Sequence, residues 1–154
     1  MIDMGMKSGK KRFFVMDLNT MTIVKRGMVA HGRGSENFTF NKTYSNASGS
    51  NCTSLGMYKV GAQYQGSYGT SFKLTGLEAT NNNAAKRSII LHSKSCIPYG
   101  ETEYPIAQSQ GCPSVAPGFL KEIAPIIASR HQPMLMWIYD PMAEGLEEEM
   151  VANY

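Results

Sequence analysis

The chain has 154 residues, 42% of them hydrophobic and 18% charged, which suits one globular domain with a single buried core. The formal net charge of +3 is too small to indicate binding to nucleic acid. No apolar run reaches the length of about 18 residues that a transmembrane helix needs, so we expect no membrane span.

The first half of the chain predicts a hairpin followed by a long loop. Residues 1–10 contain no apolar segment of the signal-peptide type, and we interpret them as an N-terminal extension. Apolar, β-branched runs at 12–18 and 21–31, with a turn between them, predict two paired strands. Residues 36–54 are rich in Asn, Ser, Thr and Gly, so we expect a surface loop there.

The second half predicts further strands and one main helix. Residues 119–130 have the helical pattern, and Pro125 predicts a kink or a restart within it. We therefore expect a mainly β domain over residues 11–141, followed by an acidic tail at 142–154 to which we assign no function. Runs of the strand type occur at residues 57–64, 71–77, 87–92 and 134–139, the last of them predicting a buried strand.

One stretch, Ser109-Gln110-Gly111-Cys112-Pro113, combines a glycine with a cysteine on a turn. Gly111 has no Cβ, so its backbone can turn sharply and approach a ligand closely. Cys112 would then present its thiol and the N–H groups of this turn to one small volume, as a nucleophile beside an oxyanion donor. The helix expected downstream, together with a basic partner, predicts a low pKa for this thiol.

His92 is the candidate partner of Cys112. It ends an apolar, β-branched run, so a strand would carry its side chain from the core to a cleft, where it can act as a general base. A cysteine in a turn and a histidine at a strand end are also common as structural groups, so the pair alone is weak evidence.

The other two cysteines, Cys52 and Cys96, are expected in loops that flank this cleft. They either form a disulfide or remain two free thiols, and we prefer the free thiols. No Cys-x-x-Cys or His-x-x-x-His spacing supports a zinc site, so we expect neither a metal nor a cofactor.

Taken together, His92 and the Ser-x-Gly-Cys motif at residues 109–112 resemble the signature of the L,D-transpeptidase (YkuD-like) catalytic domain. The segments 30–32 and 54–58 resemble two further parts of that family. Residues 61–87 look like the murein L,D-transpeptidase subfamily, and the likeness runs from about residue 11 to 141, most of the chain.

This resemblance implies a YkuD-like β-sandwich or barrel with one main helix after the cysteine. It implies acyl transfer on peptidoglycan stem peptides, by an L,D-transpeptidase or an L,D-carboxypeptidase, through a thioester on Cys112. It assigns His92 as the base and the Ser93 backbone carbonyl as the group that orients it. The turn itself offers the N–H groups of Gly111 and Cys112 as the expected oxyanion donors. The candidate substrate-binding residues are His31, Gly32, Arg33, Ser109 and Tyr58.

The resemblance also implies a periplasmic or extracellular enzyme, so we expect a signal peptide to have been removed from this chain; we further expect a monomer. One departure concerns the arginine that the common pattern places soon after the cysteine, which is absent here. A substrate carboxylate would then be bound by another cation, with Arg33, Arg87 and Lys94 as candidates.

Two alternatives stay open. The first is a cysteine peptidase with Cys52 as the nucleophile and His92 or His131 as the base, although no helix signal follows Cys52. The second is a non-catalytic β-domain that binds cell-wall polymer. His31 likewise fits a structural role about as well as a place in the cleft.

Overall fold

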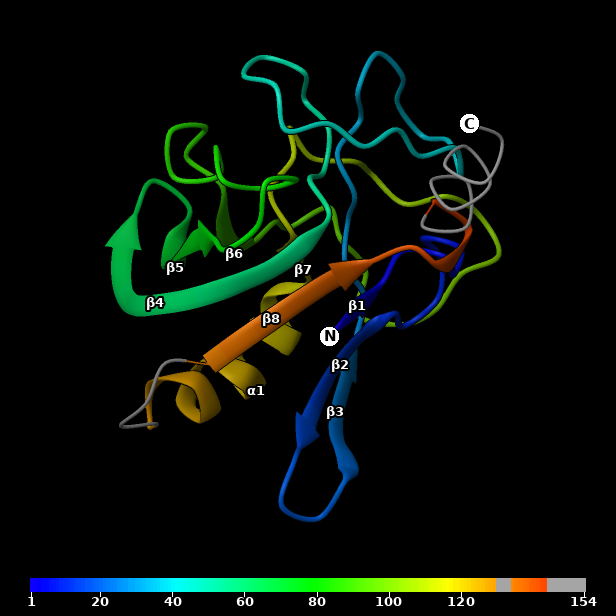
Figure 1. The fold of residues 1–154 in the computed structure, drawn as a ribbon. Coiled ribbons are helices and arrows are strands. Elements are labelled where there is room, and N and C mark those ends of the chain that lie inside the picture. The colour runs from blue at the N-terminus through cyan, green and yellow to red at the C-terminus, as the bar shows by residue number, and fades with distance from the viewer. Residues whose placement is uncertain (130–133, 144–154) are drawn as a thin grey trace.

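Eight strands and one main helix make up the fold in the computed structural model, which describes residues 1–129 and 134–143. The strands form one sheet in the order β3-β2-β1-β8-β4-β5-β6-β7 (Figure 1). The fold is therefore mainly β, as the sequence predicts. The elements are β1 (Ile2–Asp3), β2 (Phe13–Asp17), β3 (Thr22–Gly27), β4 (Gly56–Gly66), β5 (Gly69–Gly76), β6 (Ile90–Ser93), β7 (Ser114–Val115), α1 (Pro117–Ala128) and β8 (Met134–Tyr139).

The sheet curls until its two edge strands nearly meet. Val29, just after β3, bridges Val115 of β7, and the Ala30 N–H donates to the Ser114 carbonyl at 2.8 Å. These two contacts join opposite ends of the strand order, so the sheet is a nearly closed barrel. Closure removes most of the unpaired backbone groups that an open edge would expose.

The expected N-terminal extension, residues 1–10, contributes a strand to this barrel, since Ile2 and Asp3 form β1. Ile2 pairs with Phe13 on one side and with Ile138 on the other, so β1 lies in the interior of the sheet. The side chains of Ile2 and Met4 are fully buried. The sequence pattern is too short here to predict a strand, because only two residues of it enter the ladder. Most of the expected C-terminal tail, residues 144–154, lies outside the described residues.

The helix α1 packs its apolar face, from Phe119 to Ala124, against the inside of the barrel. Phe119 meets Phe13 edge-on with ring centroids 5.4 Å apart. The helix continues through Pro125, so the predicted restart is wrong. Pro125 is exposed, and water can solvate the carbonyl that loses its partner.

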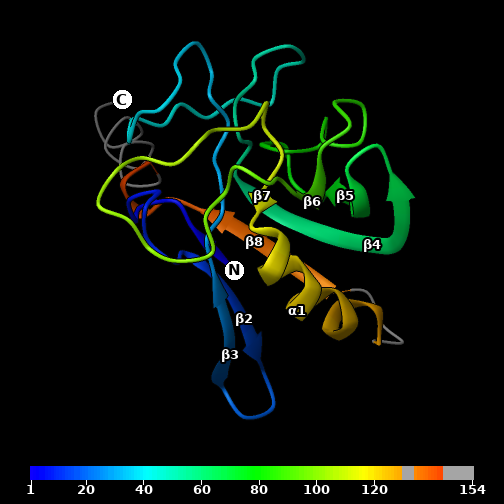
Figure 2. The same cartoon turned by 180° about the vertical axis from the view of Figure 1, so that it is seen from behind.

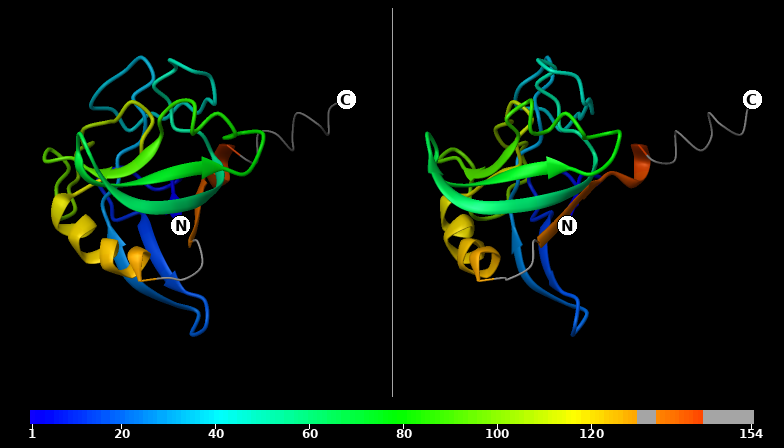
Figure 3. Two further views of the ribbon diagram at one scale, coloured as in Figure 1. Left: turned by 90° about the vertical axis from the view of Figure 1, so that its left-hand side faces the viewer. Right: turned by 60° about the vertical axis from the view of Figure 1, so that its left-hand side comes forward.

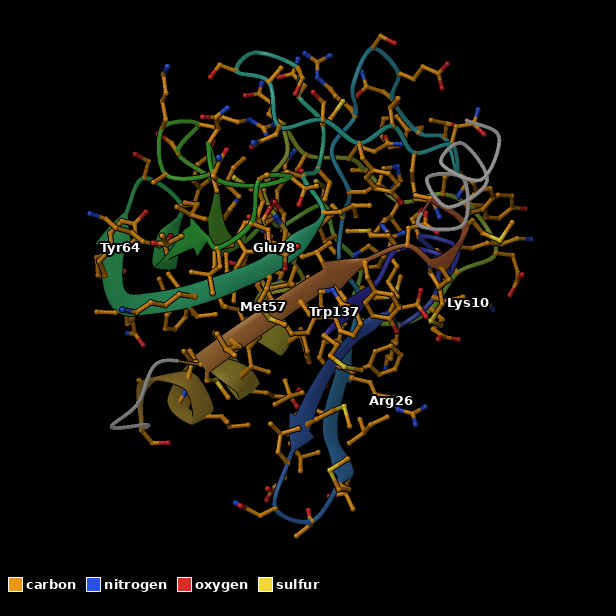
Figure 4. All side chains as sticks on the ribbon, in the orientation of Figure 1. Lys10, Arg26, Met57, Tyr64, Glu78 and Trp137 are labelled. Atoms are coloured by element: carbon orange, nitrogen blue, oxygen red, sulfur yellow. The ribbon has the colours of Figure 1, made fainter. Side chains whose placement is uncertain are left out.

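The sequence predicts that the strand β8 is buried throughout, and this prediction is wrong. The side chains of β8 alternate between the two faces of the sheet. Met136 and Ile138 point into the core, whereas Leu135 and Trp137 are exposed. Trp137 is the register partner of Met57 in β4, and Figure 4 shows both on the outer face of the sheet. Where only one face of a sheet is covered, a strand made entirely of apolar residues can therefore expose every second side chain to solvent.

The long connections gather at one end of the barrel, and the β2–β3 hairpin projects from the other end (Figures 2 and 3). The loop end contains the expected surface loop at residues 36–54 and the connections that follow β5 and β6. Residues that are far apart in the sequence therefore meet there. No helix in the described part of the chain is long and apolar enough to cross a membrane.

Candidate active site

Two parallel neighbours in the sheet bring the histidine and the cysteine turn together. His92 of β6 is the Cα partner of Ser114 in β7, and Ser93 is the partner of Val115. Cys112 lies on the turn that enters β7. The pairing of β6 with β7 therefore sets His92 beside the segment that carries Cys112, although the 20 residues from 94 to 113 separate the two strands.

Both residues line one cleft with a volume of about 490 Å³. This is within the usual size range of small-molecule sites. Of the described residues that line it, three are cations and none carries a carboxylate, so the cleft favours an anionic ligand. The lining residues are Arg33, Asn37, Tyr68, Arg87, Ser88, Ile90, His92, Lys94, Gln108, Ser109, Gln110, Cys112 and Ser114.

The His92 ring is held by hydrogen bonds at both nitrogens. Nδ1 lies 2.9 Å from the Ser93 carbonyl oxygen, which can only accept, so Nδ1 carries the proton. Nε2 lies 3.0 Å from Ser114 Oγ and is left with a lone pair. The Tyr68 ring from the β4–β5 turn covers the imidazole at a centroid distance of 4.3 Å. The Ser93 carbonyl oxygen thus lies where it can hold the ring in this tautomer.

Burial lowers the pKa of His92 below its ordinary value, and the nearby Lys94 charge adds to this effect. The Ser93 carbonyl opposes the shift, because it stabilises the protonated ring. The imidazole is consequently neutral at neutral pH and available as a base.

The Cys112 thiol is partly buried and bonded to backbone groups. Its Sγ accepts from the Ile90 N–H at 3.5 Å and donates to the Ser88 carbonyl at 3.8 Å. Burial raises the pKa of the thiol, while the Ile90 N–H and the Arg87 charge lower it to a smaller extent. Neither hydrogen bond of this sulfur goes to His92.

These facts correct the predicted low pKa of Cys112. The prediction relied on a helix N-terminus, but α1 begins only at Pro117, after β7, and the helix dipole acts over little more than one turn. At neutral pH Cys112 is therefore a neutral thiol and His92 a neutral imidazole. A thiolate must be formed by proton transfer, as in general base catalysis.

Gly111 has the backbone conformation that the motif predicts, with φ at +114°. A methyl group on it would lie 2.7 Å from the Cys52 carbonyl oxygen and 3.0 Å from Arg87 Nη2. Only glycine fits this position. The Gly111 N–H donates to Ser109 Oγ at 3.1 Å, so it is already engaged and is not the free oxyanion donor that the sequence suggests.

Arg87 lies in the cleft wall behind this turn. Its Nη1 donates to the Ser45 carbonyl at 3.0 Å and to Ser54 Oγ at 3.3 Å. Its Nη2 donates to the Cys52 carbonyl at 2.6 Å and to Ser50 Oγ at 3.3 Å. All four partners are neutral, so the guanidinium ties the 45–54 loop to the site and retains an uncompensated positive charge there.

The strand end at residues 31–33 frames the cleft through its backbone. Ser109 N–H donates to the His31 carbonyl at 2.9 Å, and Arg33 N–H donates to the Ser109 carbonyl at 2.8 Å. Gly32 bridges Ser109 between these bonds. Arg33 and Ser109 thus lie in the cleft, as predicted.

Three of the expected substrate-binding residues are buried away from the cleft. His31 is 1% exposed and is held by Arg12 at 2.9 Å and by the Asn41 carbonyl at 3.1 Å, which supports the structural alternative. Gly32 is buried, and its N–H donates to Thr53 Oγ1 at 2.8 Å. Tyr58 is fully buried, with its hydroxyl donating to the Ser54 carbonyl at 2.7 Å. The side chains of His31 and Tyr58 therefore do not line the cleft, and Gly32 has no side chain.

The site also contains residues that sequence reasoning missed. Ser114 lacks any sequence signal, because its contact with His92 depends on the pairing of two strands that are distant in the chain. Tyr68 lies in a turn between two predicted strands. Its aromatic character in a Gly-rich turn was the one available hint, since turn tips rarely need a large ring.

All three cysteines are free, so Cys52 and Cys96 form no disulfide. Cys52 is buried and does not line the cleft, which leaves it badly placed as an alternative nucleophile. His131, its second candidate base, lies outside the described residues. Within residues 1–129 and 134–143, no group of His, Cys, Asp or Glu side chains is arranged to hold a metal ion.

A comparison with known protein families matches the chain to the L,D-transpeptidase catalytic domain over residues 1–139. The match covers nearly the whole chain and includes the strand β1. The chain therefore belongs to the YkuD-like L,D-transpeptidase family, whose members carry out cysteine-dependent acyl transfer on peptidoglycan. Searches of curated proteins and of solved structures give no significant match.

Proposed function

We propose that this protein transfers acyl groups of peptidoglycan stem peptides through a thioester on Cys112, with His92 as the general base. The observation that carries the proposal is the cleft itself. Its lining includes both the Cys112 thiol and the neutral His92 imidazole, and the charged residues that line it within the described part of the chain are the cations Arg33, Arg87 and Lys94. A stem peptide offers this cleft both an acyl carbon and carboxylates.

The first half of the reaction forms the thioester. The thiol of Cys112 attacks a peptide carbonyl carbon while its proton passes to His92 Nε2, and the carbonyl oxygen becomes an oxyanion. The Cys112 N–H is the donor left for this oxyanion, because the Gly111 N–H is bonded to Ser109. One such donor contributes roughly 3 kcal/mol to the barrier reduction. His92 then returns the proton to the leaving amine as the C–N bond breaks.

The second half resolves the thioester. An amine gives transpeptidation, and water gives carboxypeptidation, with His92 accepting the proton of either nucleophile. The C–S bond breaks as the new C–N or C–O bond is completed, and the departing Cys112 sulfur takes the proton back from His92. The Ser93 carbonyl, 2.9 Å from Nδ1, holds the ring in the tautomer that both halves need.

Substrate carboxylates are bound by the cations at the cleft. Arg87 has its four Nη hydrogen bonds already formed and acts as a fixed charge. Arg33 and Lys94 also line the cleft, and their side chains have no hydrogen-bond or ion-pair partner among the described residues. Arg33 can hold a carboxylate through two parallel N–H···O bonds, which takes the place of the arginine missing after Cys112.

The enzyme would work outside the cytoplasm, as a monomer and without a metal or cofactor. Members of the family are typically periplasmic enzymes of the cell wall, which supports this location.

Intact mass spectrometry tests the proposal. The protein is incubated with a stem tetrapeptide or with a carbapenem, which acylates cysteine nucleophiles of this kind. We expect one adduct in the wild type and in Cys52→Ala, and none in Cys112→Ala. An adduct that persists in Cys112→Ala and vanishes in Cys52→Ala would favour the cysteine peptidase alternative. The absence of any adduct in the wild type would favour a binding domain. Adding a D-amino acid then distinguishes the exchange product of a transpeptidase from hydrolysis.

A further inference from the structure

We propose that Ser114 is a positioning residue whose hydroxyl gives His92 Nε2 a hydrogen-bond partner in both charge states of the imidazole. The inference rests on the proposed function for its catalytic meaning, but its geometry and its effect on His92 are independent of the substrate.

The pairing of β6 with β7 fixes this contact. Ser114 Oγ lies 3.0 Å from His92 Nε2 and 3.5 Å from the carbonyl oxygen of Cys112. Ser114 is fully buried, so bulk water cannot supply its hydrogen bonds. The Ser114 hydroxyl therefore lies between the base and the backbone of the nucleophile.

In the neutral state, the direction of each hydrogen bond follows from the acceptors. The Ser93 carbonyl takes the proton of Nδ1, so Nε2 has only a lone pair and must accept from the Ser114 O–H. This bond stabilises the neutral base in the tautomer that catalysis needs.

When His92 takes the thiol proton, the same hydroxyl reverses its role. Rotation about the C–O bond of Ser114 turns its O–H toward the Cys112 carbonyl and frees the Nε2 lone pair. The S–H bond of Cys112 breaks as an N–H bond forms at Nε2, and the sulfur keeps the electron pair. The new N–H can then donate to Ser114 Oγ. Ser114 gains and loses no proton in this cycle.

The second arrangement is the stronger one, because a hydrogen bond from a charged donor is stronger than one between neutral groups. Ser114 therefore favours the imidazolium over the neutral ring. Other groups act on the same ring: the Lys94 charge disfavours the imidazolium, while Arg87 and the Cys112 thiol lie in the same cleft. Tyr68 covers one ring face at 4.3 Å. Among the residues that the structure describes, no carboxylate lines the cleft to stabilise the charge in place of Ser114.

The chain offers a matched control in Ser71. His92 is the Cα partner of Ser71 in β5 and of Ser114 in β7, so one serine flanks it on each side. Both serines are fully buried. The Ser71 hydroxyl donates to the Gly69 carbonyl at 3.1 Å and has no bond to His92.

The test compares Ser114→Ala, Ser114→Thr and Ser71→Ala in the full chain. The pKa of His92 is measured by NMR, with His92→Gln used to assign its signal. The rate of acylation by a stem tetrapeptide is measured in single turnovers across pH. We expect Ser114→Ala to lower the pKa of His92 and to slow acylation about tenfold at saturating peptide, with an unchanged half-saturating concentration. Ser114→Thr should restore both quantities, and Ser71→Ala should alter neither.

An unchanged pKa of His92 in Ser114→Ala would overturn the inference. So would faster acylation in that variant, because Ser114 would then only compete with the thiol for Nε2. If Ser114→Ala does not fold, the nearly isosteric pair Ser114→Thr and Ser114→Val provides the same comparison. If the wild type forms no thioester, the proposed function fails, whereas the pKa comparison still decides the role of Ser114.

Discussion

Arg87 Nη2 donates to the backbone oxygen of Cys52 over 2.6 Å, and this bond joins the segment before β6 to the loop that passes behind Gly111. The same guanidinium binds two serine hydroxyls and one more carbonyl in that loop. Its charge lowers the pKa of the Cys112 thiol, against the larger effect of burial. One side chain therefore serves both the shape and the electrostatics of the cleft.

Arg87→Lys should weaken both effects. A lysine ammonium has three donors on a flexible stem and cannot reproduce four bonds from a planar fork. We expect the free energy of unfolding in urea to fall by about 2 kcal/mol and the pKa of Cys112, followed by its alkylation rate against pH, to rise. Arg33→Lys is the control, because Arg33 lines the same cleft without a side-chain partner among the described residues. If Arg33→Lys lowers the free energy of unfolding and raises the pKa of Cys112 as much as Arg87→Lys does, the structural role of Arg87 is contradicted.

The three free cysteines should react in an order set by exposure and thiol pKa. Cys96 is exposed, Cys112 is partly buried with a raised pKa, and Cys52 is buried. With a small neutral alkylating agent at pH 6 to 7, we expect labelling of Cys96 first and of Cys52 last, as measured by peptide mass spectrometry. The rate at Cys112 should climb as the pH rises through and beyond the ordinary thiol range, since only the thiolate reacts. If Cys112 is labelled before Cys96 at pH 6, the result would contradict a raised pKa of Cys112 and support the low pKa that the sequence predicts.

Arg33→Ala should impair binding of the stem peptide without altering the thiol. Loss of a charge-assisted hydrogen bond is expected to weaken productive binding by roughly 1.5–3 kcal/mol. Alkylation of Cys112 by a small neutral reagent should be unchanged. Arg26→Ala removes the same charge from the β2–β3 hairpin, where Figure 4 shows Arg26 away from the loop end, and it should leave acylation unaffected. If both variants acylate like the wild type, the carboxylate is bound elsewhere and Lys94 is the next residue to change.

Gly111→Ala should abolish acylation and destabilise the protein. At φ +114° an alanine is strained, and its methyl group would overlap the Cys52 carbonyl oxygen at 2.7 Å. We expect a loss of at least about 2 kcal/mol in the free energy of unfolding. Gly100→Ala is the matched control, because a methyl group there meets nothing within 4 Å. Wild-type acylation by Gly111→Ala would show that the turn does not need this conformation.

His31 should make the fold sensitive to acid. Burial and the adjacent Arg12 charge lower the pKa of His31 from 6.5 to about 4. The unfolded chain therefore takes up the proton near pH 6.5 and the folded protein only near pH 4. Stability is full above pH 6.5 and falls by roughly 3 kcal/mol as the pH drops to 4.

Urea unfolding at a series of pH values measures this loss. His31→Gln can keep both hydrogen bonds without titrating, so its stability should depend less steeply on pH between 6.5 and 4. An identical slope in the variant and the wild type would assign the acid sensitivity to other groups.

The local sequence pattern determined the positions of several strands, the turn before Cys112 and the family of this protein. Alternating and β-branched runs located the strands near residues 13–17, 56–66 and 69–76, because side-chain direction alternates within a strand whatever the strand pairs with. Gly111 predicted a sharp turn, which the structure shows with a positive φ, and the Ser-x-Gly-Cys motif with His92 indicated the family that the comparison confirms. These features depend on neighbours in the chain, which a sequence displays directly.

Tertiary structure decided everything that depends on which distant segments meet. The sheet order places β1 between β2 and β8, so two residues without a local signal become part of the sheet, and one of them, Ile2, enters the core. The pairing of β6 with β7 places Ser114 on His92, and the start of α1 after β7 leaves Cys112 without the helix dipole. The pKa of His31 and of Cys112 follows from burial, and burial is a property of the assembled barrel. Solvent exposure and electrostatic environment are sums over contacts between residues remote in sequence, and no local pattern specifies those contacts.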